Sequence, residues 1–344
     1  MGKKLCQLGI IFFVFCFIIG GFSSPVAAGE KTFNWNSQSI FPAGSSVYKE
    51  FVSFTENVKK LTGGRLVITP HPVGAIVGYK DMHSALRTGI LNAYFSAPTF
   101  QSGKEPAFSI LTDLPGGYEN VMQFDAWYYK KGGIELMREA QSKFGNYTVG
   151  VIFYGREVLP SRVPIRGIAD MKGKKIRAAE GIIAKLMTAM GASTVSIPGS
   201  EVYSALDKGV VDASDWGTRS MNDQMGLYEV CKYSIEPGFH SMSALEFVVS
   251  NKNWNALPED IKGILNTAVR EWSWNTVATI MKEDAEKSEK LKKLGVEIIS
   301  FPDKDYMEIR VMARKLWEDW AKKSPMSKRV VDSQIQWCKE LGLL

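Results

Sequence analysis

The chain has 344 residues, 45% of them hydrophobic, and its 42 basic and 36 acidic residues give a net charge of +6. So small a charge, without a run of five or more basic residues, argues against a nucleic-acid-binding protein. The length is sufficient for two domains of ordinary size.

The first 28 residues have the three-part pattern of a secretory signal peptide. Two lysines precede an apolar run at 8–19, and small residues close the segment at Val26-Ala27-Ala28. A membrane anchor is the alternative, but the run is shorter than the roughly 20 residues that a span needs. We expect cleavage near Ala28 and a periplasmic protein. The remaining chain keeps Cys231 and Cys338, which allow one disulfide at most.

The mature chain alternates predicted helices and strands. Apolar residues spaced by three and four predict a helix over residues 45–61, which Gly63-Gly64 ends, and a short strand at 65–69. The second half repeats this order, with a strand at 174–178, a helix at 182–190 and a strand at 194–197. Such alternation favours parallel sheets built from βαβ units.

Two ten-residue segments, 84–93 and 204–213, resemble copies of each other. Both read S-A-L-x-x-G, two apolar residues, Asn or Asp, then Ala, which predicts a helix end, a closing glycine and a strand. The pattern is common, so a chance match is the alternative. If the repeat is real, Phe95-Ser96 and Asp215-Trp216 both follow strands, and two facing lobes would form a ligand cleft at those strand ends.

The segments between the predicted lobes indicate how they are joined. Residues 148–154 and 244–250 are apolar runs suited to strands that cross between lobes, and 258–294 predicts one helix of roughly 55 Å. A coiled coil is the alternative for 258–294, but sustained heptads are absent. We therefore predict an α/β fold of two lobes, residues 29–153 plus about 244–275 and residues 154–243 plus about 276–344, spanned by the long helix.

Several motifs together resemble a known family. TGGRLVI, GGIELMREA, DMKGKKIRA, SEVYSALDKGVVDASDW and LPEDIK occur in the order seen in the DctP-type solute-binding proteins of tripartite ATP-independent periplasmic (TRAP) transporters. The resemblance covers nearly all of the mature chain. It implies the type II periplasmic binding protein fold, with two lobes that close over a small carboxylate and deliver it to membrane permease subunits driven by an ion gradient.

Two arginines are candidates for binding that carboxylate. Arg177 lies where the family has its carboxylate-binding arginine, and a guanidinium offers two parallel donors that match a carboxylate. The alternative interpretation is that Arg177 is a solvated surface charge within a K-K-x-R string. Arg156 follows the first crossing strand, where many relatives place a second arginine, and its alternative is a structural ion pair in the hinge.

The sequence Val211-Asp-Ala-Ser-Asp-Trp-Gly looks closest to the branch that binds 2-oxo acids or lactate through a bridging cation. That resemblance implies a partial cage made by Asp215, the Trp216 carbonyl and Glu157, because hard cations prefer several oxygen ligands. Two acids would favour Ca²⁺ over Na⁺, although no cofactor is strictly required. The alternative is an aspartate that caps a turn beside a packed tryptophan.

Further residues are candidates for the cleft wall. Ser96 and Phe100 follow the matching strand of the first lobe, and Phe239 or His240 precedes the second crossing strand. Core packing is the alternative for the phenylalanines. Ser241 stands where the 2-oxo acid branch would offer an acid, which favours a different or larger ligand.

The sequence leaves several functions open. A 2-oxo or 2-hydroxy monocarboxylate is the preferred ligand, and a dicarboxylate, sugar acid or aromatic acid bound without metal is the alternative. Catalytic motifs such as H-E-x-x-H and G-x-S-x-G are absent, so an exported hydrolase or lyase is disfavoured. A sensor domain is the third class. The amphipathic C-terminal segment predicts packing on its own lobe, and pairing into a homodimer is an alternative.

Overall fold

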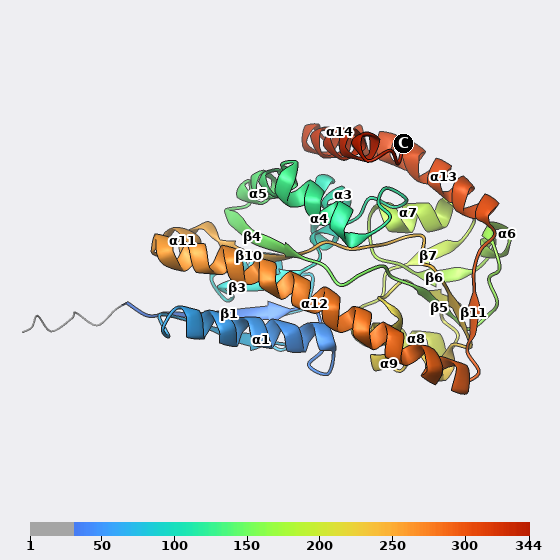
Figure 1. The fold of residues 1–344 in the computed structure, drawn as a ribbon, viewed down its shortest axis with the longest axis horizontal. Helices are drawn as coiled ribbons and strands as arrows, with labels where there is room; N and C mark the ends of the chain where they lie inside the picture. The colour runs from blue at the N-terminus through green and yellow to red at the C-terminus, as the bar shows by residue number, and fades with distance from the viewer. Residues whose placement is uncertain (1–30) are drawn as a thin grey trace, which may run out of the picture. The chain divides into compact units, whose positions relative to one another are not determined.

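Two β-sheets organise residues 31–344, the part of the chain that the computed structural model describes (Figure 1). The first sheet has the strand order β2-β1-β3-β10-β4, and the second has the order β11-β9-β5-β8-β6-β7. The predicted signal peptide lies outside the described residues. The strands are β1 (Phe33–Ser39), β2 (Leu66–His71), β3 (Ala93–Ser96), β4 (Asn146–Ile152), β5 (Leu159–Ser161), β6 (Lys175–Arg177), β7 (Ser193–Val195), β8 (Ala213–Ser214), β9 (Tyr233–Ile235), β10 (Leu245–Ser250) and β11 (Glu297–Ile299).

The first sheet combines parallel and antiparallel pairing. Strand β1 runs parallel to β2 and β3, whereas β10 runs antiparallel to β3 and β4. Helix α1 follows the predicted range, because the Ser45 side chain accepts the N–H of Tyr48 at its start. The helices connecting this sheet are α1 (Ser46–Leu61), α2 (Met82–Thr88), the 3₁₀ turn η1 (Pro98–Gln101), α3 (Ala107–Thr112), α4 (Val121–Lys130) and α5 (Gly133–Ser142).

The second sheet is built from shorter strands. Strand β6 pairs in parallel with β7 and β8, and β5 pairs antiparallel with β8 and β9. Residues expected as strand, helix and strand over 174–197 fold as β6, α7 and β7. The helices between these strands are α6 (Ile168–Met171), α7 (Ile182–Ala189), the turn η2 (Gly199–Glu201), α8 (Val202–Asp207), α9 (Arg219–Gln224) and α10 (Leu227–Val230).

The chain crosses between the sheets at the ends of the two predicted crossing strands. Strands β4 and β10 pair with each other inside the first sheet, and the crossing itself is made by residues 153–158 and 236–244. Helix α12 (Glu259–Lys293) follows α11 (Asn251–Asn255) and contacts α1 and β4 on one side and α9 on the other. Its 35 residues span about 52 Å. The predicted spanning helix and two-lobed α/β fold are therefore confirmed (Figure 1).

The C-terminal helices return from one sheet to the other. Helix α13 (Asp303–Ala321) packs on α7, and α14 (Pro325–Glu340) packs on α3 and α5. The apolar face of α14 is buried, including Val330, Val331 and Cys338. The predicted lobe boundaries stay a proposal, since α14 follows the second lobe in sequence but contacts helices of the first.

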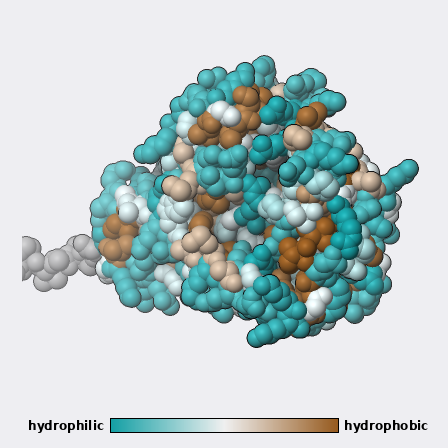
Figure 2. Space-filling view, turned by 45° about the vertical axis from the view of Figure 1, so that its right-hand side comes forward, coloured by the Kyte–Doolittle hydropathy of each residue, from teal (hydrophilic) through white to brown (hydrophobic). Residues whose placement is uncertain are grey.

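The described residues bury most of their apolar side chains in two large clusters, one largely within the first lobe and one that runs from first-lobe helices through the crossing segments to the second sheet. One cluster contains Phe51, Phe247 and Trp272, and another contains Phe124, Phe153 and Trp317. Figure 2 shows one face of the molecule, which is mostly hydrophilic and carries separate patches of hydrophobic residues. Among the described residues, no helix is both long and apolar enough to span a membrane.

Candidate ligand-binding cleft

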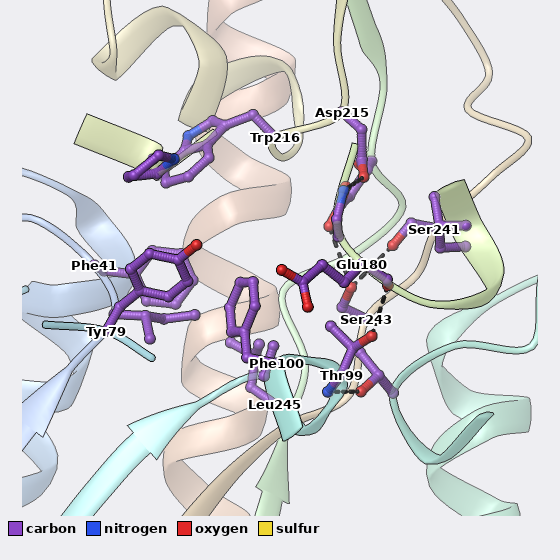
Figure 3. A pocket seen from close by; sticks show the side chains of 18 of the residues that line it. Phe41, Tyr79, Thr99, Phe100, Glu180, Asp215, Trp216, Ser241, Ser243 and Leu245 are labelled. Carbon is purple, nitrogen blue, oxygen red and sulfur yellow. Dashed lines mark hydrogen bonds between the residues drawn. The ribbon is translucent and has the colours of Figure 1, made fainter. Parts of the chain in front are cut away.

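A cavity of about 120 Å³ lies between the two sheets and takes its lining from both lobes. Aromatic side chains occupy one side of it, and most of the polar groups face them from the other side (Figure 3). The apolar wall includes Phe41, Tyr79, Phe100, Trp216 and Leu245, and the charged lining includes Asp113, Glu157, Arg177, Glu180 and Asp215. The cavity thus offers an apolar half and a polar half to one small ligand.

Arg177 is the buried cation of this cavity. It ends β6 with only 6% of its surface exposed, and its Nε donates a hydrogen bond to the carbonyl of Ile197 at 3.2 Å. Its Nη1 donates to the carbonyl of Asp215. Within the described chain, no hydrogen bond uses Nη2. The fold therefore fixes the guanidinium through two backbone carbonyls and leaves Nη2 for a ligand.

Trp216 forms the wall beside this arginine. The Arg177 guanidinium carbon lies 5.5 Å from the centroid of the indole ring, a favourable cation–π distance. The ring packs so closely on Gly199 that a Cβ there would lie 2.2 Å from it. Glycine at position 199 therefore permits the indole to occupy its place above the cavity (Figure 3).

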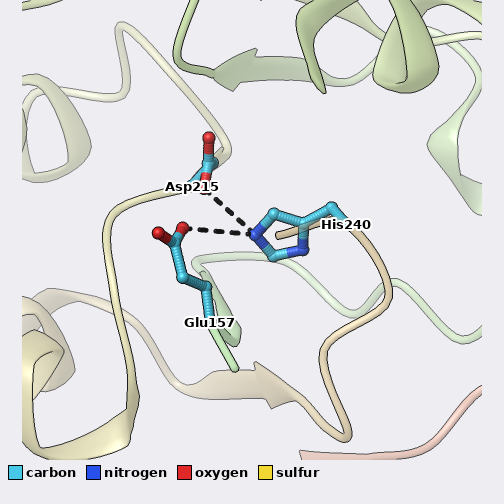
Figure 4. A group of neighbouring side chains, drawn as sticks. All are labelled: Glu157, Asp215 and His240. Carbon is cyan, nitrogen blue, oxygen red and sulfur yellow. Dashed lines mark hydrogen bonds and ion pairs between the residues drawn. The ribbon is translucent and has the colours of Figure 1, made fainter. Parts of the chain in front are cut away.

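Glu157 and Asp215 of the cavity lining meet the buried His240, although the three residues come from separate segments (Figure 4). His240 Nε2 lies 3.0 Å from Asp215 Oδ1 and 3.7 Å from Glu157 Oε2. The second oxygen of Asp215 accepts the N–H of Ala179 at 3.1 Å. The second oxygen of Glu157 accepts the hydroxyl of Tyr154.

The three groups shift one another's proton affinity. Burial lowers the pKa of His240, but the carboxylates of Asp215 and Glu157 outweigh burial and raise this pKa to about 10. Burial, and then the charge of Asp215, raises the pKa of Glu157 to about 7. Burial would raise the pKa of Asp215, yet the hydrogen bond with Glu157 and the charge of His240 hold it below its usual range. The arrangement is therefore an imidazolium held by an ionised aspartate.

The two crossing segments approach each other closely at this point. A Cβ on Gly238 would lie 1.5 Å from the carbonyl oxygen of Glu157, so only glycine fits there. The N–H of Glu157 donates to the carbonyl of Ser241 at 3.1 Å. Asp113 extends the network, because the hydroxyls of Ser241 and Ser243 donate to it at 3.0 and 2.9 Å. The hinge is thus continuous with the polar half of the cavity.

The lobes also contact each other across the mouth of the cavity. Thr99 Oγ1 donates a hydrogen bond to the carbonyl of Glu180 at 2.8 Å, and the Glu180 carboxylate forms an ion pair with Lys80. The N–H of Ile182 donates to Ser109 Oγ at 2.8 Å. Because these pairs join residues of different lobes, the structure represents a closed arrangement.

The structure brings most of the predicted site residues together, but three of them have other surroundings. Arg156 donates to the carbonyls of Gly238, Tyr118 and Glu119 at 3.1, 3.1 and 2.7 Å, so it ties the two crossing segments to the first lobe. Phe239 stacks on Phe301 with ring centroids 5.2 Å apart. Ser96 is buried at the end of β3 and does not line the described cavity, whereas the next residue, Ala97, does.

Sequence reasoning missed several cavity residues. Asp113, Tyr154 and Ser243 belong to the polar network, and Tyr79 and Glu180 line the cavity near its mouth. The only sequence signal that could have indicated Asp113 is that it directly follows an apolar helical segment. The only signal for Tyr154 is that it ends a predicted crossing strand. His240 was considered as a cleft residue, but its pairing with Asp215 could not be read from the sequence.

Comparison with known proteins identifies the family to which this cleft belongs. Residues 37–324 match the model of the bacterial extracellular solute-binding proteins, family 7 (DctP). A TRAP periplasmic solute-binding protein from Rhodobacter sphaeroides, solved in an apo open state, is 32% identical, with 90% of this chain and 99% of that chain covered and a TM-score of 0.73. This chain belongs to the TRAP solute-binding proteins. The predicted family and fold class are therefore confirmed.

Two other relatives carry names that describe a ligand. A monocarboxylate 2-oxoacid-binding periplasmic protein from Nostoc sp. is 25% identical over 92% of this chain and 86% of its own length. A TRAP solute-binding protein from Colwellia psychrerythraea, solved with bound calcium and pyruvate, is 26% identical over 90% of this chain and 95% of that chain, with a TM-score of 0.82. TRAP solute-binding proteins are periplasmic receptors that work with permease subunits, and they are not enzymes.

Proposed function

We propose that this TRAP solute-binding protein is the receptor for a small monocarboxylate, most specifically a 2-oxo or 2-hydroxy acid. The observation that carries the proposal is the buried Arg177, which lines the cavity and keeps Nη2 free of hydrogen bonds within the described chain. A buried cation needs an anionic partner, and a carboxylate matches the guanidinium in charge and shape.

The rest of the lining favours one carboxylate over two. Apart from Arg177, the charged residues that line the described cavity are the acids Asp113, Glu157, Glu180 and Asp215. A second carboxylate on the ligand would approach these acids without a cation of its own to pair with. A dicarboxylate would therefore bury one of its two charges without a cationic partner in this lining, whereas a monocarboxylate on Arg177 would not.

The remaining part of the ligand meets both polar and apolar groups. The hydroxyl oxygens of Ser241 and Ser243 and the carboxyl of Glu157 lie in the polar part of the lining, where a hydroxyl group beside the ligand carboxylate can donate to them and a protonated Glu157 can donate to an oxo group. Phe100 and Trp216 provide an apolar wall for a short carbon chain. The names of the Nostoc and Colwellia relatives agree with this ligand class.

Closure of the lobes would couple binding to transport. An acid held by Arg177 in the second lobe and packed on Phe100 in the first contacts both lobes, so it stabilises the closed state by its differential affinity. The bonds from Thr99 to Glu180 and from Ile182 to Ser109 would form in the same step. The permease subunits would then distinguish the closed, loaded receptor from the open, empty one.

Export and assembly complete the proposal. The first 28 residues would be removed as a signal peptide near Ala28, which intact-mass analysis of the protein from a periplasmic extract would test. Homodimer formation is a separate proposal, and light scattering at several concentrations would test it. The buried apolar face of α14 gives it no added support, because that face packs inside the chain.

A thermal-shift screen followed by calorimetry tests the ligand class. The unfolded and refolded protein, freed of carried-over ligand, would be mixed with 2-oxo, 2-hydroxy, dicarboxylic, sugar and aromatic acids. Pyruvate or lactate should raise the melting temperature by several degrees when present far above its dissociation constant. A response to dicarboxylates alone, or to none of the acids, would contradict the proposal.

A further inference from the structure

The cluster of Glu157, Asp215 and His240 raises the question of whether this receptor uses a metal ion. Each of the three residues offers one atom, and these atoms lie within 4.8 Å of one another. The Colwellia relative was solved with calcium beside pyruvate. The sequence likewise suggested a cation between Asp215 and Glu157, so the side chains around both acids decide whether an ion fits.

Three of the four carboxylate oxygens of this pair already accept a hydrogen bond from the protein, and the fourth, Glu157 Oε2, faces the His240 ring. Asp215 Oδ2 accepts the N–H of Ala179 at 3.1 Å, and Glu157 Oε1 accepts the hydroxyl of Tyr154. The two remaining oxygens, Asp215 Oδ1 and Glu157 Oε2, both face His240 Nε2 at 3.0 and 3.7 Å (Figure 4). The imidazole therefore lies where an ion would have to contact both carboxylates, and it is hydrogen-bonded to Asp215 and ion-paired with Glu157.

The imidazole of His240, the third group of the cluster, is also a poor ligand for Ca²⁺ or Na⁺. Hard cations take oxygen ligands, whereas the ring nitrogen of histidine suits zinc and other transition metals. The side chain of His240 is fully buried, and the adjoining Gly238 holds its segment against Glu157. The backbone that carries His240 is therefore held close to the segment that carries Glu157.

We infer that this receptor binds its acid without Ca²⁺ or Na⁺, because the imidazole of His240 takes the position between Asp215 and Glu157 that a bridging ion would need. The histidine acts as a positioning residue: it orients the two carboxylates, and Asp215 in turn orients Arg177 through its backbone carbonyl. The part of this inference that concerns acid binding rests on the proposed function, whereas the exclusion of the metal does not.

Titration with metal alone tests the exclusion directly. Purified protein would be stripped with EDTA and titrated with Ca²⁺ by calorimetry, with Tb³⁺ as a luminescent substitute and Zn²⁺ in a separate arm. We expect no stoichiometric binding of any of the three ions and no metal in the untreated protein by elemental analysis. Stoichiometric Ca²⁺ or Tb³⁺ binding would overturn the inference, and stoichiometric Zn²⁺ binding would overturn it in favour of a transition-metal site.

His240→Ala tests the role given to the imidazole. Without the ring, Asp215 and Glu157 face an open space, so Ca²⁺ should now bind and raise the melting temperature of the variant. His240→Gln, which keeps an N–H donor in a similar place, is the matched control and should remain insensitive to Ca²⁺. If both variants fold and neither responds to Ca²⁺, the assignment of metal exclusion to His240 is overturned.

Binding of pyruvate separates this inference from the proposed function. If wild-type protein binds pyruvate with the same affinity in EDTA with potassium salts alone, in Na⁺ and in Ca²⁺, both the inference and the proposed function stand. A requirement for Ca²⁺ of tenfold or more in affinity overturns the metal-free inference and leaves the receptor proposal intact. Failure to bind any acid, together with absence of metal binding, counts against the receptor proposal alone.

Discussion

The two repeated segments, 84–96 and 204–216, start with the same structure and end with different roles. In both, a helix ends near a left-handed glycine, and the N–H of Leu91 or Val211 donates to the carbonyl of Ala85 or Ala205. The side chains of Asn92 and Asp212 each accept a backbone N–H from the neighbouring strand, at 2.9 and 2.8 Å. The copies therefore share backbone geometry as well as sequence.

They diverge where the strand ends. Strand β3 continues through Phe95, whose ring lies 4.5 Å from that of Trp272 in the core of the first lobe. Strand β8 stops at Ser214, and the next residues, Asp215 and Trp216, line the cavity. A strand that is two residues shorter thus turns a core position into a cavity-lining position, and Arg177, Glu180 and Asp215 of the second lobe are three of the five charged residues in the lining.

The largest effect expected from this comparison concerns Arg177 in the second lobe. Arg177→Ala should weaken acid binding by on the order of 2 to 5 kcal/mol, because the ligand carboxylate would be desolvated without a partner. Calorimetry with pyruvate measures the loss. The exposed Arg166, paired with Glu297 away from the cavity, provides the control, and Arg166→Ala should leave the affinity within twofold. An Arg177→Ala protein with unchanged affinity would contradict the account.

Glu246 in the first lobe should affect stability and not binding. Burial raises its pKa from 4.5 to about 8, so between these values the unfolded chain releases a proton that the folded chain keeps. The free energy of unfolding contributed by Glu246 is thus fully present below 4.5 and is lost as pH rises toward 8. Denaturation from pH 5 to pH 8 should show a flatter decline for Glu246→Gln than for wild type.

The exposed Glu286 on α12 is the matched control for this substitution. Glu286→Gln should keep the wild-type pH dependence, and both variants should bind pyruvate as wild type does, since neither residue lines the described cavity. An unchanged pH slope in Glu246→Gln would show that the buried carboxyl is not responsible.

Gly89 and Gly209 test whether the two copies are energetically alike. Their φ angles of +80° and +70° are unfavourable for alanine, so each Gly→Ala change should cost about 1 to 2 kcal/mol of unfolding free energy. A Cβ at 89 meets nothing within 4 Å, and one at 209 meets the mobile end of Arg162 at 2.7 Å. Urea denaturation should therefore give nearly equal losses, and a negligible loss at either position would break the comparison.

Asp212 gives the smallest expected effect. Asp212→Asn makes the second copy identical to the first at this position and keeps an oxygen acceptor for the N–H of Lys175, so stability should change by less than about 0.5 kcal/mol. Asp212→Ala removes the acceptor and should cost about 1 kcal/mol. Equal losses from both substitutions in urea denaturation would mean that the charge, and not the hydrogen bond, matters.

Sequence predicted those features that depend on local pattern. The ranges of α1 and α12 followed from apolar spacing and from the glycines or prolines at their ends. The position of Arg177 at a strand end followed from its flanking apolar residues and from the family resemblance. These features need no knowledge of which distant segment lies opposite.

The features that sequence could not predict depend on distant partners. Arg156 has the charge for a ligand contact, but the carbonyls of Tyr118 and Glu119 lie within its reach and hold it elsewhere. Phe239 stacks on Phe301, which lies some sixty residues further along the chain. His240 meets Asp215 only because two crossing segments approach through Gly238. Such pairings arise from the fold and leave no local signal.

A crystal structure of the protein with pyruvate bound would test the central claim most directly. We expect a closed molecule with the pyruvate carboxylate on Arg177 Nη2, its methyl group against Phe100 or Trp216, and His240 still between Asp215 and Glu157. Pyruvate bound away from Arg177 would contradict the account.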